Sequence, residues 1–233
     1  MRIGVIADVH ANFEALEAVL EEFERRQVAR IFCLGDLVGY GASPREVIER
    51  VREKAHGCVL GNHDAAILRD ELWPLFSRNQ QVVLRYTRRV LGPEHLAYLR
   101  SLPLVLKGQL ATYVHASLHE PEHWPYVMTL EDAQKLFQHL QTPLCFVGHT
   151  HIPGLLCEQV GVFRFQAGPR YVINPGSVGQ PRDGDPRASA AILDTEAWAL
   201  EFVRVEYDVE GAARKILKAG LPREYAQRLR QGF

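Results

Sequence analysis

The chain has 233 residues, with 27 lysines and arginines against 28 aspartates and glutamates, and 47% of its residues are hydrophobic. These proportions are typical of one compact soluble domain, which at this length buries a sizeable core without disulfides or a structural metal. A net charge of -1 provides no bulk field for nucleic acid or an anionic membrane, and no apolar run is long enough to span a bilayer. We therefore expect a cytoplasmic protein with no bulk nucleic-acid binding and no membrane partner.

Short apolar or β-branched runs predict buried strands in the first two thirds of the chain. They cover residues 2–7, 30–34, 57–60, 110–114 and 144–147. Amphipathic patterns predict one helix after Asn12, a plausible N-cap, and another from Pro44 to Val51. Strands that alternate with helices indicate an α/β layered domain.

The stretch from about 64 to 103 is mainly helical in pattern, and a further helix is predicted from Asp132 to Leu140. We interpret 64–103 as a helical excursion from a single domain spanning 1–233. Later strands are predicted at 155–160, 161–166, 170–174, 188–194 and 199–207, before a helical segment at 208–232. Four cysteines, which lack the paired spacings of zinc sites, are expected to be buried, reduced thiols: Cys33, Cys58, Cys145 and Cys157.

Metal-binding residue types follow the predicted strands of the first two thirds. They are Asp8 and His10 after the first strand, Asp36 after the second, Asn62 and His63 after the third, His115 after the fourth, and His149 and His151 after the fifth. Ligands bind beyond the carboxyl ends of the strands in open α/β sheets, so these clusters should converge. Imidazole, carboxylate and amide oxygen suit Mn, Fe, Zn, Co or Ni. Each residue alone has an ordinary explanation in a turn or core, but five such clusters together do not.

The same segments resemble the conserved blocks of a known family. They are DVH at 8–10, GDLVGYG at 35–41, GNHD at 61–64, VHAS at 114–117 and GHTH at 148–151, joined by INPGSVGQPRD at 173–183. In this order they are similar to the calcineurin-like metallophosphoesterase superfamily, and the last resembles its small bacterial branch. The resemblance implies a four-layer α/β/β/α sandwich with two mixed sheets.

The resemblance also implies a site with two divalent metal ions. By that similarity Asp8, His10 and His151 bind the first ion, Asn62, His115 and His149 bind the second, and Asp36 bridges both. His63 corresponds to the catalytic histidine, and an unperturbed pKa near 6.5 would suit a proton donor. Asp64 either orients the His63 imidazole or caps the helix that follows; both interpretations remain open.

Substrate contacts are expected from loops around the metals. The candidates are Tyr40, Ser177 and Arg182, with Arg182 suited to a second phosphate, although a solvated surface arginine is an equal alternative. His119, His123 and Trp124 could line the entrance to the site, but an ordinary surface loop is favoured for them. The predicted function is hydrolysis of a small-molecule phosphate ester: a phosphodiester, a nucleotide, a phosphomonoester or a diadenosine polyphosphate. A protein phosphatase and a non-catalytic scaffold are the alternatives, and a homo-oligomer remains open.

Overall fold

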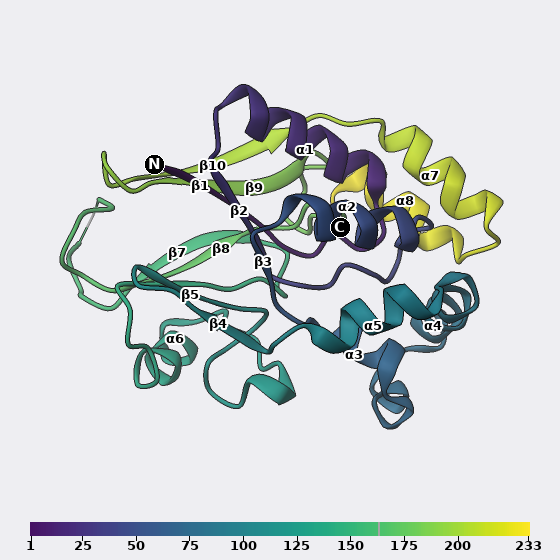
Figure 1. The fold of residues 1–233 in the computed structure, drawn as a ribbon, viewed down its shortest axis with the longest axis horizontal. Coiled ribbons are helices and arrows are strands. Elements are labelled where there is room, and N and C mark those ends of the chain that lie inside the picture. Colours follow the sequence, from purple (N-terminus) through teal and green to yellow (C-terminus); the bar gives the residue numbers. More distant parts are fainter. Residues whose placement is uncertain (163) are drawn as a thin grey trace.

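The computed structural model, which describes residues 1–162 and 164–233, contains two five-stranded sheets packed face to face (Figure 1). The first has the order β10-β9-β1-β2-β3 and the second the order β4-β5-β6-β8-β7. The strands of the first sheet are β1 (Arg2–Ile6), β2 (Arg30–Cys33), β3 (Gly57–Cys58), β9 (Ala188–Asp194) and β10 (Ala199–Val205). Those of the second are β4 (Val105–Lys107), β5 (Ala111–Val114), β6 (Leu144–Phe146), β7 (Pro153–Cys157) and β8 (Tyr171–Pro175).

Both sheets are mixed. In the first, β1 pairs in parallel with β2 and β2 with β3, whereas β9 is antiparallel to β1 and β10. In the second, β5, β6 and β8 run parallel, and the edge strands β4 and β7 are antiparallel to their neighbours. The parallel strands of each sheet therefore carry their carboxyl ends to one edge, where following loops can meet.

Alternating side chains of the strands separate the core into layers, as the period of two in a strand requires. Ile3 and Val5 of β1 face Phe146 and Ile173 of the second sheet, and form the cluster between the sheets. On the outer face of the first sheet, the apolar stripes of α1 (Phe13–Arg25) and α2 (Pro44–Lys54) pack over residues such as Ile6. On the outer face of the second lies α6 (Leu130–Phe137). The predicted α/β/β/α sandwich is confirmed.

The helical excursion lies at one end of the sandwich (Figure 1). It comprises α3 (Asn62–Leu68), a 3-10 helix η1 (Asp70–Leu75), α4 (Arg78–Val90) and α5 (Pro93–Ser101). Its side chains Phe76, Leu84 and Leu99 belong to the same core cluster as α1 and α2. The last two helices, α7 (Val209–Lys218) and α8 (Arg223–Gln231), pack on each other, and α7 contacts α1. No helix of the described residues is long and apolar enough to cross a membrane.

Two sequence expectations need correction. The described residues of the expected strand at 161–166 form a turn and irregular backbone instead, and Phe163 lies outside the described residues. The run is apolar because Val162 and Phe165 pack against the cluster between the sheets from a loop. All four cysteines are free, but only three are fully buried, because Cys157 lies on the edge strand β7 and is half-buried.

Candidate metal centre

The expected metal-binding residues converge at the carboxyl ends of strands from both sheets. Loops after β1, β2 and β3 meet those after β5 and β6, as strand-end placement predicts. Several of these residues have left-handed backbone conformations that non-glycine residues rarely adopt: Asp8 (φ 53°), His10 (φ 48°), Asp36 (φ 51°), His149 (φ 68°) and His151 (φ 63°). Such strain persists only where surrounding structure holds it, and it is concentrated at functional sites.

Two sets of side chains match the ligand sets implied by the sequence. In each set one ligand atom per residue lies within 4.8 Å of the others: Asp8, His10 and His151 in the first, Asp36, His115 and His149 in the second. The Asn62 amide oxygen Oδ1 lies 3.1 Å from His115 Nε2, next to the second set. Gly61 leaves room for this packing, since a Cβ there would stand 2.0 Å from Asp36 Oδ1.

Backbone carbonyls orient three of the imidazoles. The Nδ1 contacts are His10 to Val38 O (2.9 Å), His115 to Leu34 O (2.7 Å) and His151 to Gln180 O (2.5 Å). A carbonyl oxygen only accepts, so Nδ1 must carry the hydrogen in each ring. In the neutral imidazole, Nε2 then presents a lone pair, and these Nε2 atoms point into the cluster.

The cluster is crowded with hydrogen-bond acceptors that lack donors. His10 Nε2 and His151 Nε2 face each other at 3.1 Å, and Asp8 Oδ1, 3.4 Å from His151 Nε2, is buried with no hydrogen-bond partner. Facing lone pairs repel one another, and a buried carboxylate oxygen without a donor is costly. A divalent cation removes both penalties, and the nitrogen and oxygen donor set fits such an ion.

Asp36 lies between the two sets. Its Oδ1 accepts the backbone N–H of His63 at 2.9 Å, which fixes the carboxylate. Its Oδ2 stands 3.6 Å from His10 Nε2 and 3.5 Å from His115 Nε2. This is the position that a carboxylate bridging two ions would take.

Burial dominates the titration of the metal-free cluster. It raises the pKa of Asp8 to about 7 and that of Asp36 to about 8, and it holds the pKa of His10 and His151 well below the usual range. These directions keep the imidazoles neutral, as metal binding requires. Burial, followed by the positive charge of Arg182, also lowers the pKa of His63 to about 3. In the free protein the His63 imidazole is therefore neutral near pH 7.

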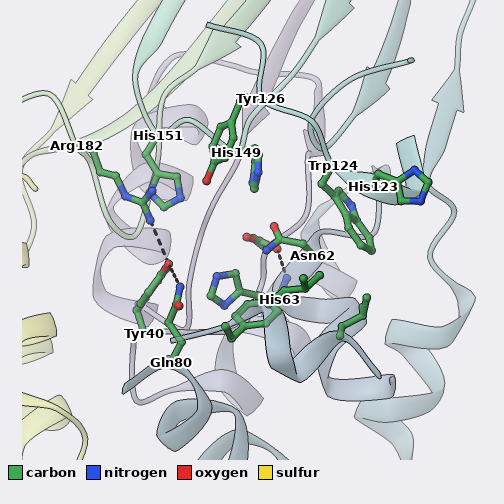
Figure 2. A pocket seen from close by; sticks show the side chains of 14 residues that line it. Tyr40, Asn62, His63, Gln80, His123, Trp124, Tyr126, His149, His151 and Arg182 are labelled. Carbon is green, nitrogen blue, oxygen red and sulfur yellow. Dashed lines mark hydrogen bonds between the residues drawn. The ribbon is translucent and has the colours of Figure 1, made fainter. Parts of the chain in front are cut away.

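A cavity of about 280 Å³ opens over this cluster (Figure 2). Its floor includes Asp36, Asn62, His63, His149 and His151. On one side Tyr40, Gln80 and Arg182 form a polar wall, and Trp124 and His123 lie on the opposite side in Figure 2. The helical excursion supplies the apolar part of the lining, which consists of Leu72, Leu75 and Phe76.

The structure separates the three expected substrate contacts. Tyr40 and Arg182 line the cavity and are joined by a hydrogen bond of 3.2 Å from Arg182 Nη2 to the Tyr40 hydroxyl. Ser177 is fully buried and does not line it. Its hydroxyl donates to Asp8 O at 2.7 Å and accepts from Gln180 N at 2.8 Å, so the expected substrate contact is wrong. Ser177 instead ties two backbone segments of the site together.

Asp64 also acts on the backbone. Its carboxylate accepts N–H groups from Leu37 at 2.9 Å, Val38 at 3.2 Å and Gly61 at 3.2 Å. Neither expected role holds as stated: Asp64 is the third residue of α3 and Gly61 is its N-cap, and the recorded partners of the Asp64 carboxylate are backbone N–H groups and not the His63 ring. Through its contacts with Leu37 and Val38, Asp64 holds the loop that carries Asp36.

Sequence reasoning missed part of the cavity. Gln80 carries no chemical signal beyond a Ser-x-x-Gln capping pattern. For the loop after His115 the disfavoured alternative is the one observed, since His123 and Trp124 line the cavity. Trp124 is only 7% exposed, and Tyr126 stacks on His149 with ring centroids 4.0 Å apart. Two aromatic residues in a short segment after His115 were the signal that could have identified this wall.

Comparison with known proteins establishes the family. Residues 1–197 match the sequence profile of the calcineurin-like phosphoesterase superfamily domain. The chain belongs to this superfamily. Its class is therefore that of the metal-dependent phosphoric ester hydrolases, and its His and Asp groups are positioned for metal binding.

Relatives of this superfamily member cover nearly its whole length. An uncharacterised protein of Methanocaldococcus jannaschii is 41% identical over 97% of this chain and 96% of its own. The crystal structure of a metallophosphoesterase from Sphaerobacter thermophilus, 42% identical, superposes with a TM-score of 0.89 and covers 100% of this chain and 99% of that one. The phosphodiesterase YfcE of Escherichia coli is 28% identical over 86% of this chain and 91% of its own.

Proposed function

We propose that the protein is a dinuclear metal-dependent hydrolase of small phosphate esters. One observation carries the proposal: a cluster of unpaired acceptor atoms lies directly under a cavity that also exposes His63. A cluster of this kind attracts divalent cations, and the cavity above it has room for a phosphoryl group and its substituent.

Each residue of the centre has an assigned role in this proposal. The first ion would be held by Asp8, His10 and His151, the second by Asn62, His115 and His149, and Asp36 would bind both. When bound, the two ions supply an activated water and stabilise the charge on the phosphoryl oxygens. The carbonyl contacts of His10, His115 and His151 leave each Nε2 lone pair free for the ion that the residue would hold.

His63 is proposed as the group that stabilises the phosphate and protonates the leaving oxygen. The imidazole is neutral in the free protein because its pKa is about 3. The negative charge of a phosphate bound beside it would raise that pKa and favour the imidazolium. Its ring is held between His10 and Phe76, with centroids 4.9 Å away in both cases, so it needs no reorientation to act.

The cavity favours a small substrate over a protein. A phosphodiester or nucleotide fits a space of about 280 Å³, whereas a protein phosphatase needs a broad groove, and here η1 and the loop with Trp124 stand on the rim. The relative named as a phosphodiesterase supports diesters as the first class to assay. The full ligand set and His63 argue against a non-catalytic scaffold. Tyr40 and Arg182 are proposed as substrate contacts.

The direct test is hydrolysis of bis(p-nitrophenyl) phosphate and p-nitrophenyl phosphate by protein loaded with Mn, Co, Ni or Zn. We expect turnover of at least one ester with a divalent metal, loss of turnover with a chelator, and loss in the Asp8→Asn variant. Asp194→Asn makes the same change at a half-buried residue at the end of β9, opposite Arg2 at the start of β1 and outside the proposed ligand set and the cavity lining; it is the control and should keep activity. Protein that binds metal but hydrolyses neither ester nor any nucleotide would favour the scaffold.

A further inference from the structure

The polar wall of the cavity contains a hydrogen-bonded trio from three separate segments (Figure 2). The hydroxyl oxygen of Tyr40, in the loop after β2, accepts from Gln80 Nε2 at 2.9 Å and from Arg182 Nη2 at 3.2 Å. Gln80 belongs to α4 of the helical excursion, and Arg182 lies in the loop between β8 and β9. The helical excursion therefore contributes Gln80 to the polar wall of the cavity.

The direction of these hydrogen bonds is fixed by the start of α4. The Ser77 backbone N–H donates to Gln80 Oε1 at 2.8 Å in a capping box. A backbone N–H can only donate, so that amide atom is the oxygen, and the Gln80 amide nitrogen must face Tyr40. Arginine has no acceptor, so Arg182 also can only donate to the Tyr40 hydroxyl.

The Tyr40 hydroxyl thus accepts two hydrogen bonds, and its own hydrogen has no acceptor among the described side chains that contact it. Tyr40 is 6% exposed and lines the cavity, and a phenolic hydroxyl keeps its proton near neutral pH. Among the described residues, Arg182 has no carboxylate within ion-pair distance: its Nη2 donates to the Tyr40 hydroxyl and to Gln180 Oε1, and its Nε is buried without a hydrogen-bond partner. A hydroxyl donor and a guanidinium with an unused N–H group therefore stand together at the cavity wall.

We propose that Tyr40 and Arg182 form a subsite for a second phosphoryl group, and that Gln80 is the positioning residue that turns the Tyr40 hydrogen toward it. The inference rests on the proposed function, because the metal centre places the first phosphate. The Tyr40 ring lies 4.6 Å from that of His10 and 4.8 Å from that of His63, so the subsite adjoins the reaction centre. The substrate class is then esters of diphosphate or longer polyphosphates.

Calorimetry tests the subsite by comparing the affinities of the full-length, manganese-loaded protein for two anions. Methylenediphosphonate carries two phosphoryl groups and cannot be hydrolysed at its bridge, whereas orthophosphate carries one. In Tyr40→Phe we expect the affinity for methylenediphosphonate to fall on the order of tenfold, as for one lost hydrogen bond to a charged group, and the affinity for orthophosphate to fall much less. Equal losses for both anions would overturn the second-phosphate assignment, because the hydroxyl would then serve the phosphate at the metals.

Two substitutions of Gln80 test its positioning role. In Gln80→Glu one carboxylate oxygen can still accept from Ser77, but the other now accepts the Tyr40 hydrogen and turns it away from the cavity. We expect methylenediphosphonate binding to weaken more than in Gln80→Met, which leaves the hydroxyl free to rotate. Asn79→Asp adds the same charge one residue away on the exposed side of α4 and should change binding little.

A double-mutant cycle separates the turned hydroxyl from the added charge. In the Tyr40→Phe background no hydroxyl remains, so Gln80→Glu should cost clearly less than it does in the wild type. Additive losses would show that Gln80 acts only through charge, and would overturn its role. The calorimetric result does not depend on turnover, so the two proposals are tested separately. Hydrolysis of nitrophenyl esters without selective loss of methylenediphosphonate binding in Tyr40→Phe would overturn the subsite alone. Selective loss of that binding without hydrolysis would overturn the proposed function alone.

Discussion

The metal cluster and the cavity wall above it are built in different ways. The candidate ligands follow the ends of five strands from both sheets, and backbone carbonyls or amides hold several of them in place. The wall is of mixed origin: loops that follow β2 and β8 supply Tyr40 and Arg182, whereas α4, η1 and the loop around Trp124, which lie outside the sheets, supply the rest. In Figure 1 the excursion that carries α4 stands to one side of the sheets.

This difference assigns separate tasks to the two regions. Residues at strand ends are positioned by the packing of two sheets, which suits chemistry that requires tight geometry. Residues on helices and loops beside them can vary without disturbing that geometry, which suits the choice of substrate. Changes in the cluster should therefore affect metal content and turnover, whereas changes in the wall should affect substrate affinity.

The largest effect is expected for Asp36→Asn. The amide oxygen can still accept the His63 N–H, but the new NH₂ group faces His10 and His115 and donates to the lone pairs that would bind metal. We expect loss of both ions and of measurable turnover. Above pH 8, where the Asp36 carboxyl of the metal-free wild type has lost its proton, the metal-free variant should be more stable by about 1 kcal/mol, as for one added hydrogen bond. Elemental analysis and denaturant unfolding measure the two outcomes; a variant that keeps two ions would contradict the bridging role.

The pH dependence of unfolding sharpens the same prediction. Burial raises the pKa of Asp36 to about 8 in the metal-free fold, above its value in the unfolded chain. The folded state then binds more protons between about pH 4 and pH 8, so the stability of the metal-free wild type should fall as pH rises across this range. Asp36→Asn removes this group and should show a shallower fall; an identical slope would show that Asp36 is not the titrating group.

The next largest effect is expected for His63→Ala. Both ions should remain bound, because His63 is a proposed proton donor and not a ligand, and kcat should fall on the order of 10²–10⁴. The loss should shrink for a nitrophenyl leaving group, which departs without needing a proton. A variant that loses metal, or that loses as much with good leaving groups as with poor ones, would remove His63 from the role of general acid.

A smaller effect is expected for Arg182→Ala in the wall. For substrates with more than one phosphate, KM should rise on the order of tenfold with little change in metal content, because one charge-assisted contact is lost. Arg100→Ala, an exposed arginine at the end of α5, is the control. Steady-state kinetics that show an unchanged KM for every multiphosphate substrate would return Arg182 to a solvated role.

The smallest effect is expected for Tyr126→Ala. This half-exposed ring stacks on His149 and lines the cavity. In Tyr126→Ala the KM for a substrate with an aromatic group should rise about two- to tenfold, the usual value of one aromatic contact. In Tyr126→Phe the KM for the same substrate should stay unchanged. If kcat falls and metal content drops instead, Tyr126 belongs to the cluster, and the separation of tasks fails at this residue.

The sequence predicted the residues of the cluster, and Tyr40 and Arg182 of the wall, but not Gln80 or Tyr126, for a physical reason. Metal chemistry restricts residue types, so Asp8, His10 and His149 were recognisable at strand ends, and strand periodicity located the sheets. The apolar run at 161–166 looked like a strand because its side chains join the core from a loop. Ser177 looked available because a hydroxyl's partners are invisible in sequence. Gln80 faces the cavity only through the tertiary placement of α4, which no local pattern encodes.

Metal stoichiometry tests the central claim most directly. Metal-free protein would be titrated with manganese or cobalt by calorimetry, with elemental analysis after removal of excess metal, in the wild type and in Asn62→Ala. We predict two ions per chain for the wild type, and for Asn62→Ala one tight ion with a second that returns only at higher metal concentration. A wild type that saturates at one ion under excess metal would contradict the dinuclear centre and leave Asn62 and His115 without a metal to bind.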